Sequence, residues 1–227
     1  MVRENSRTVY SGILYGVMAA AVLTVSLVLS ADILMLIYLL INIAGIYVNS
    51  LRNRLGLILF AAAAAIYCVV CFLNGFYGDF ALNIAIGIYY IVFFFRWQKT
   101  PEENKINSFK WFWWLIILAV GAAAVPLVTW LLSLVSTVQP LINSLSSFFT
   151  VTAVILTAAR TWQQYSLWLA VNIVQAALWI TTITQSGTDY IAMIIVNSIL
   201  LIINAYNLIV WLRLYMRQKQ ERQSDLA

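Results

Sequence analysis

The chain contains no histidine and few charged residues. Only 9% of its 227 residues are charged, and two are cysteines. It has neither a Gly-x-x-x-x-Gly-Lys-Ser/Thr motif nor a Gly-x-Gly-x-x-Gly motif, which argues against a P-loop and against a dinucleotide site of the Rossmann type. These absences predict a protein that is not an enzyme and that needs no cofactor.

The two cysteines, Cys68 and Cys71, stand one helical turn apart in an apolar stretch. A Cys-x-x-Cys pair can be redox-active or can bind a metal. Two thiols without a histidine or a nearby carboxylate do not complete a zinc site. We therefore expect no metal site here.

Long hydrophobic runs make up most of the chain, and 63% of its residues are hydrophobic. A helix needs about 17–25 apolar residues to cross a bilayer. Eight runs reach or approach this length, which predicts an all-α polytopic membrane protein with eight transmembrane helices. The runs are residues 11–29, 33–48, 55–73, 80–95, 111–132, 141–158, 166–184 and 190–212.

The basic residues fix the orientation of these spans. All thirteen Lys and Arg residues fall on one side of the eight-span topology, and the positive-inside rule assigns that side to the cytoplasm. We expect a multi-pass protein of the bacterial cytoplasmic (inner) membrane, in contact with lipid and with both termini in the cytoplasm. The net charge of +5 then reflects membrane orientation, so no nucleic-acid partner is expected.

The first span has an alternative interpretation. Arg3, Arg7, an apolar stretch and Ser30-Ala31 together resemble a secretory signal with a small-residue cleavage site. The apolar stretch is long for a signal peptide. We therefore expect it to be retained as a transmembrane helix.

Two parts of the chain are similar to each other at offsets of about 108–114 residues. Each part has an Asn followed fourteen residues later by a Trp that ends a span. Both copies cross the membrane in the same direction, and parallel repeats of this kind are typical of transporters. The matched pairs are Arg52 with Arg160, Asp79 with Asp189, Asn83 with Asn197, and Trp97 with Trp211.

The predicted organisation has five parts. A second three-helix repeat can run parallel to the first only if a single helix connects the two. The parts are an extra N-terminal transmembrane helix (residues 1–30), a first three-helix repeat (31–97), a cytoplasmic linker with the connecting helix (98–134), a second three-helix repeat (135–215) and a cytoplasmic tail (216–227).

Aromatic and carboxamide side chains share one face of the predicted seventh span. They are Tyr165, Trp168, Asn172, Gln175 and Trp179, at helical spacing. Such a face can stack a flat heterocycle, hydrogen-bond its polar edge and attract a cationic ring. The alternative is an interfacial aromatic belt with interhelical Asn contacts. We favour binding for the deeper residues Trp168 and Asn172.

For other polar and aromatic residues both interpretations, substrate binding and a structural or interfacial role, remain possible. Asn83, Asn197 and Asn204 are further candidates for substrate binding, and Asn207 could extend the polar face of the last span or bond a neighbouring helix. For tryptophans at span ends beside basic residues we favour the interfacial belt. These are Trp97, Trp111, Trp113, Trp114 and Trp211.

Two segments resemble the PnuC family of bacterial vitamin transporters. Phe76-Tyr-Gly-Asp-Phe-Ala-Leu-Asn83, which leads to Phe95-Arg-Trp97, resembles the family's third core helix, and Tyr165-Ser-Leu-Trp168-Leu-Ala-Val-Asn172 is similar to its Trp-x-x-Trp-x-x-x-Asn motif. The resemblance implies a 3+1+3 parallel repeat like an enlarged SWEET fold, after one extra N-terminal helix. It also implies a homotrimer, facilitated diffusion and trapping of the substrate through phosphorylation by a cytoplasmic kinase.

The chain departs from the family motif at two positions. Tyr165 stands where the family has Trp, and Gln163 stands where a carboxylate is common. The resemblance implies nicotinamide riboside as the first candidate substrate and thiamine as the second, with riboflavin and deoxynucleosides carried by other relatives. Both leading candidates are flat and cationic.

Two other classes of protein compete with a transporter. An intramembrane enzyme usually has clustered acidic or histidine residues at a membrane face, and none is seen in the sequence. A structural membrane subunit is the stronger competitor. It should tolerate Trp168→Ala and Asn172→Ala, whereas a transporter should not.

We expect counterflow of substrate in liposomes and no accumulation driven by an ion gradient. Ion-coupled carriers usually place a titratable group within their spans. Here every carboxylate lies at a predicted span end or in a loop, and only Asp79 and Asp189 are candidates for coupling. Accumulation driven by an imposed proton or sodium gradient, with counterflow intact, would contradict this uniport hypothesis.

Overall fold

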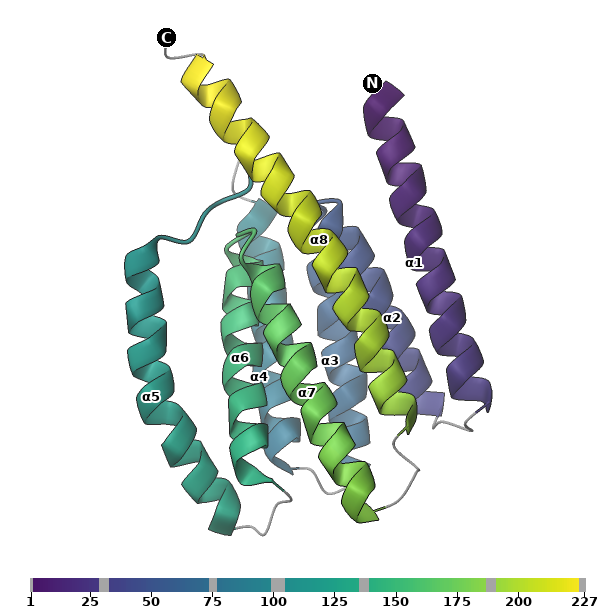
Figure 1. Ribbon diagram of the computed structural model, residues 1–227, viewed down its shortest axis with the longest axis vertical. Coiled ribbons are helices and arrows are strands. Elements are labelled where there is room, and N and C mark those ends of the chain that lie inside the picture. Colours follow the sequence, from purple (N-terminus) through teal and green to yellow (C-terminus); the bar gives the residue numbers. More distant parts are fainter. Residues whose placement is uncertain are drawn as a thin grey trace. The chain divides into compact units, whose positions relative to one another are not determined.

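The computed structural model describes residues 2–28, 33–73, 77–98, 105–134, 139–186 and 191–224. These ranges are helical apart from turns, short irregular stretches and one isolated β-bridge. The helices are α1 (Val2–Val28), α2 (Ile33–Ser50), α3 (Leu55–Leu73), α4 (Tyr77–Gln98), α5 (Trp111–Leu134), α6 (Pro140–Ala158), α7 (Gln164–Ser186) and α8 (Ile191–Ser224) (Figure 1).

The predicted all-α fold is confirmed, with one helix for each apolar run. Six helices are long and apolar enough to cross a membrane, namely α2, α3, α4, α5, α6 and α8. The apolar part of α1, Gly12–Val28, is shorter, and α7 falls outside this set over its described residues. The count of eight spans therefore stays a prediction.

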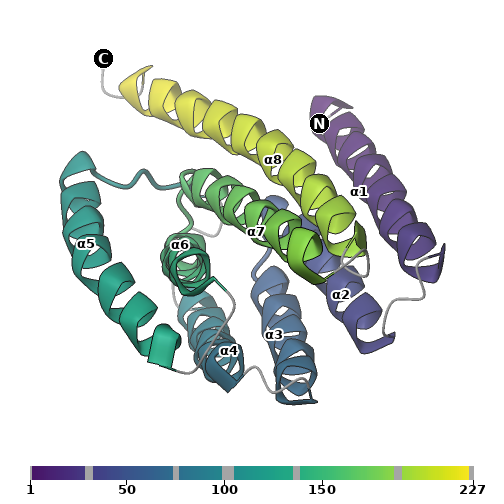
Figure 2. The same ribbon diagram turned by 60° about the horizontal axis from the view of Figure 1, so that its bottom comes forward.

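The chain forms two compact units, Met1–Asn104 and Lys105–Ala227. In the first unit, α1 packs on α2, α2 on α3 and α3 on α4. In the second unit, α5 packs on α6, α6 on α7 and α7 on α8, so that α7 lies between α6 and α8 (Figure 2). Within each unit the described helices thus pack on their neighbours in sequence, while much of the apolar surface of α4 and α5 stays exposed.

The core of the first unit depends on one close approach between α2 and α3. A Cβ added at Gly45 would lie 2.8 Å from Cδ1 of Phe60, so the ring of Phe60 packs directly against the α2 backbone. On its other side Phe60 contacts Tyr90 of α4, with ring centroids 5.2 Å apart. Small residues commonly let membrane helices approach in this way.

The turns between α2 and α3 and between α6 and α7 have the same hydrogen-bond pattern. Arg52 and Arg160 each adopt a left-handed conformation, with φ of 64° and 52°. Their amides donate to the carbonyls three residues back, at 2.8 and 3.1 Å. The next amides donate to the carbonyls five residues back, at 3.2 Å in both turns. This is a Schellman motif, and it occurs at both positions. The three-helix repeat itself stays a prediction.

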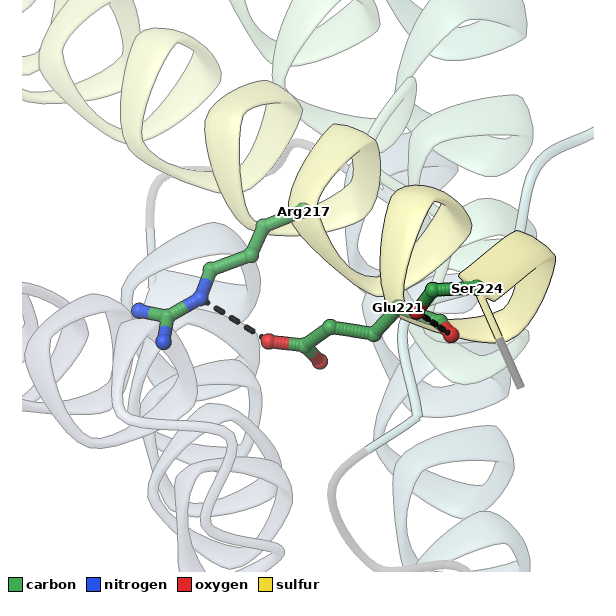
Figure 3. A network of polar contacts seen from close by, with 3 residues as sticks. All are labelled: Arg217, Glu221 and Ser224. Atoms are coloured by element: carbon green, nitrogen blue, oxygen red, sulfur yellow. Dashed lines mark hydrogen bonds and ion pairs between the residues drawn. The ribbon is translucent and has the colours of Figure 1, made fainter.

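The last helix continues well past its apolar run, which was predicted to end at residue 212. Helix α8 extends to Ser224, through a segment of good helix formers. Arg217 and Glu221 pair at 3.0 Å one turn apart, and the Ser224 hydroxyl donates to the Glu221 carbonyl at 2.7 Å (Figure 3). These local contacts favour a helix where apolar burial no longer does.

We expect Gly45→Ala to lower the free energy of unfolding by about 1–3 kcal/mol, because the new methyl group would overlap the Phe60 ring. Thermal unfolding in detergent measures this. Gly16→Ala is the matched control, since a Cβ at Gly16 would have no neighbour within 4 Å. If both substitutions had the same effect, the close packing of α2 on Phe60 would be contradicted.

Candidate functional site

The predicted site residues are divided between the two units. Asn83 lies on α4 in the first unit, where its Nδ2 donates to the Asp79 carbonyl at 2.8 Å. The side chain of Asn83 is half-buried and engaged at the start of its own helix. The other six candidates lie in the second unit, on α7 (Tyr165, Trp168, Asn172 and Gln175) and α8 (Asn197 and Asn204).

Tyr165 is built into the protein core at the start of α7. Its side chain is only 1% exposed, and its ring meets Trp211 of α8 edge-on at a centroid distance of 5.4 Å. Ile106 belongs to the same buried cluster. In this conformation Tyr165 shapes one end of the α7–α8 contact, and its ring offers no open face to a ligand.

Trp168 is half-buried and its indole is fixed by a hydrogen bond. Its Nε1 donates to Oγ1 of Thr157 at 3.2 Å, and the same hydroxyl donates to the Ala153 carbonyl at 2.8 Å. Thr157 is fully buried, and its hydroxyl both accepts and donates a hydrogen bond within the protein. The indole also packs on a cluster of Ala153, Leu156 and Leu167.

Asn172 is buried with an unused hydrogen-bond donor. The residue is 3% exposed, and its Nδ2 has no partner among the described residues. Leaving a buried amide donor unsatisfied costs about 1–3 kcal/mol, so such groups need an explanation. A polar ligand that accepts this hydrogen bond would remove the cost.

One buried asparagine of α8, Asn204, lies at the depth of Asn172. From the contact of Tyr165 with Trp211, Asn172 is seven residues along α7, and Asn204 is seven residues back along the adjacent α8. Seven residues span about 10 Å in each helix, so the two asparagines reach the same level. Asn197 and Asn207 are also buried on α8, while Gln175 is half-buried. The Trp179 side chain lies outside the described residues.

This part of the second unit is polar but carries no formal charge. Residues 164–186 and 191–212 contain no Asp, Glu, Lys or Arg. An indole beside carboxamides in such surroundings can stack a flat ring and hydrogen-bond its polar edge. Among the described residues no group of three or more His, Cys, Asp or Glu side chains could hold a metal, and Cys68 and Cys71 are free and buried.

Two residues that support the site were not predicted as site residues. Thr157 fixes Trp168, and Gln163 binds the backbone of Phe109. Thr157 and Trp168 face each other across the short α6–α7 turn, so antiparallel pairing about that turn could have identified the contact. The partner of Gln163 is 54 residues away in sequence, and no local pattern indicates it.

The predicted interfacial belt is wrong for two of its five tryptophans. Trp97 and Trp211 are buried, at 5% and 1% exposure, and Trp211 packs on Tyr165 within the second unit. Trp111 and Trp113 are exposed, at 75% and 46%, as a belt residue should be. A position at a span end therefore does not decide which way a tryptophan faces.

The fold and the neutral aromatic–carboxamide face define a multi-pass helical membrane protein with a candidate site for a small flat ligand. A family model described as "nicotinamide mononucleotide transporter" matches residues 32–213, and the chain belongs to this family. The predicted membership of the PnuC-type family is thereby confirmed.

Two individual proteins resemble the chain. The nicotinamide riboside transporter PnuC of Neisseria mucosa is 24% identical over 165 residues, which cover 68% of this chain and 62% of that protein. The chain thus matches less than two thirds of that relative's length. A solved structure described as the crystal structure of the vitamin B3 transporter PnuC has a TM-score of 0.76 at 18% identity, with 92% of each chain covered. This second likeness supports the fold.

We expect Thr157→Val to lower the free energy of unfolding by about 1–2 kcal/mol, because the Trp168 indole N–H would lose its acceptor while the side-chain shape is kept. Thermal or denaturant unfolding measures the loss. Thr24→Val is the matched control, because Thr24 makes only the same kind of bond to the carbonyl four residues back, at an exposed position. Equal effects of the two substitutions would count against the Thr157–Trp168 bond.

Proposed function

We propose that the protein is a transporter that imports a flat, cationic vitamin-type substrate, nicotinamide riboside, by facilitated diffusion. The observation that carries this proposal is the unsatisfied buried amide of Asn172, one helical turn from the fixed indole of Trp168. The pyridinium ring would stack on Trp168, and its carboxamide would accept the hydrogen bond from Nδ2 of Asn172. The name of the Neisseria mucosa relative points to the same substrate.

The charge of the site favours the riboside over the mononucleotide. A phosphate group needs an Arg or Lys, or a helix N-terminus, to replace its hydration. Helix α7 has no basic residue, and α8 has none before Arg213. A neutral site suits a cationic ring and its ribose hydroxyls, and it gives a phosphate dianion no partner along these helices.

Thiamine is the second candidate substrate. It is also flat and cationic, so stacking on Trp168 does not distinguish the two vitamins. Tyr165 in place of the family's Trp is the feature that favours thiamine, since a phenol places its polar group differently from an indole. The burial of Tyr165 against Trp211 weakens this argument, because the ring then acts through its neighbours.

The transport cycle proposed here is uniport between two parallel three-helix repeats, in a homotrimer. The matching Schellman turns at Arg52 and Arg160 support the repeat. The lack of a carboxylate, a histidine or a basic residue within 164–186 and 191–212 supports passive transport. A cytoplasmic kinase would trap the arriving substrate as its phosphate, which the neutral site would no longer accept. The termini would lie in the cytoplasm, with the basic residues.

Thermal-shift measurements on the detergent-purified protein test the substrate assignment. We expect nicotinamide riboside to raise the melting temperature, because a ligand that binds only the folded state stabilises it by mass action. Nicotinamide mononucleotide, thiamine, riboflavin, deoxynucleosides and nicotinamide are the comparison ligands. Trp168→Ala and Asn172→Leu should abolish the shift, whereas the exposed control Trp111→Ala should keep it.

A shift with thiamine alone would replace the first candidate by the second. A shift with the mononucleotide equal to that with the riboside would contradict the charge argument. If no ligand shifted the melting temperature, and Trp168→Ala left the cell's vitamin uptake unchanged, the transporter proposal would fail in favour of a structural membrane subunit.

A further inference from the structure

The segment that precedes α5 is tied to the α6–α7 turn and to α8. We call residues 105–110 the linker strap. The amide of Ile106 donates to Oε1 of Gln218 on α8 at 3.1 Å. Asn107 forms a parallel β-bridge with Thr161, in which its amide donates to the Arg160 carbonyl at 2.9 Å. The Asn107 side chain donates to the Ala159 carbonyl at 3.0 Å.

Gln163 binds the other end of the linker strap. Its Oε1 accepts from the Phe109 amide at 3.1 Å, and its Nε2 donates to the Phe109 carbonyl at 3.2 Å and to the Ser108 hydroxyl at 3.1 Å. One buried side chain thus satisfies both polar groups of the Phe109 backbone. A carboxamide can do this, whereas an ionised carboxylate of the same shape cannot, because it has no proton to donate to a carbonyl.

The apolar side chains of the linker strap lie in the clusters that hold the two motif aromatics. Ile106 is buried with Tyr165 and Trp211. Phe109 packs on the cluster of buried residues on which Trp168 also packs. Ile106 and Phe109 are three residues apart, as are Tyr165 and Trp168, so one strap residue supports each motif residue.

We propose that the linker strap is a positioning element of the substrate site and that Gln163 is the residue that fastens it. This inference rests on the proposed function. Gln163 holds Phe109, and Phe109 packs on the same cluster as Trp168, so Gln163 influences the position of the Trp168 side chain. Gln163 itself does not touch the substrate. Segments that open readily have few buried contacts and exposed backbone hydrogen bonds. The linker strap instead has two side chains packed in clusters and backbone bonds to two other segments, the α6–α7 turn and α8, which indicates a fixed support.

The carboxamide of Gln163 can be tested against a carboxylate of the same shape. A carboxylate here would place a negative oxygen against the Phe109 carbonyl that Nε2 now binds. Gln163→Glu should therefore release the strap, although it changes the side chain's volume little. Gln163→Met keeps the length of the side chain and removes both hydrogen-bonding functions.

Affinity measurements in a double-mutant cycle test the proposal. The dissociation constant of the purified full-length protein for nicotinamide riboside is measured for the wild type, Gln163→Met, Trp168→Phe and the double variant. We expect Gln163→Met and Gln163→Glu each to weaken binding by about five- to tenfold, the effect of one lost oriented contact. In a protein that already carries Trp168→Phe, adding Gln163→Met should weaken binding by less than about a further twofold. The effects of two substitutions are not additive when the residues are coupled.

The controls are Gln220→Met and Gln220→Glu, which make the same chemical changes at an exposed position on α8. They should leave the affinity unchanged. Independent, fully additive effects of Gln163→Met and Trp168→Phe, or unchanged affinity in both Gln163 variants, would overturn the positioning role. Failure of the wild type to bind nicotinamide riboside would instead overturn the proposed function, so the two failures are distinguishable.

Discussion

The structure depends on one constraint, which is that polar groups inside an apolar helical protein must find partners within the protein. A membrane offers no water to an unpaired N–H or C=O group. The chain meets this demand with local bonds where it can, as at Thr157 and Ser144, whose hydroxyls donate to carbonyls four residues back. Where local bonds do not suffice, distant segments supply the partners, and the bonds between Gln163 and Phe109 are an example. The Nδ2 of Asn172 is among the few buried polar atoms of the described residues without such a partner, and it lies one helical turn from Trp168 on α7.

The second unit can be understood as a support for two aromatic residues with different tasks. Tyr165 is surrounded by Ile106 and Trp211 and serves packing, whereas Trp168 keeps part of its surface free and has its edge fixed by Thr157. A fixed indole loses little entropy when a ring stacks on it, which favours affinity. The asparagines of α7 and α8 add hydrogen-bonding groups without charge. Selectivity would then come from shape and hydrogen bonds, with charge contributing through the π face of Trp168.

The sequence predicts the helices well and the contacts between distant segments poorly. The run at residues 55–73 coincides with α3, because hydropathy marks both ends and a tight turn precedes Leu55. The end of α8 is missed, since charged residues at helical spacing continue a helix that hydropathy no longer detects. The burial of Trp97 and Trp211 is missed for another reason, and so is the linker strap. These features depend on tertiary contacts. A single sequence carries no local signature of a β-bridge between positions 107 and 161.

The left-handed arginines at the two short turns would give these turns a double role in the predicted membrane topology. Glycine is the usual residue at such a position, and an arginine there costs on the order of 1 kcal/mol of backbone strain. An arginine in a short loop, however, also directs that loop to the cytoplasm as the chain is inserted. In the predicted topology, which places both turns in the cytoplasm, Arg52 and Arg160 would exchange some folded-state stability for a topological signal at the hairpin itself. The direction of each helical hairpin would then be encoded in the same residue that closes its turn.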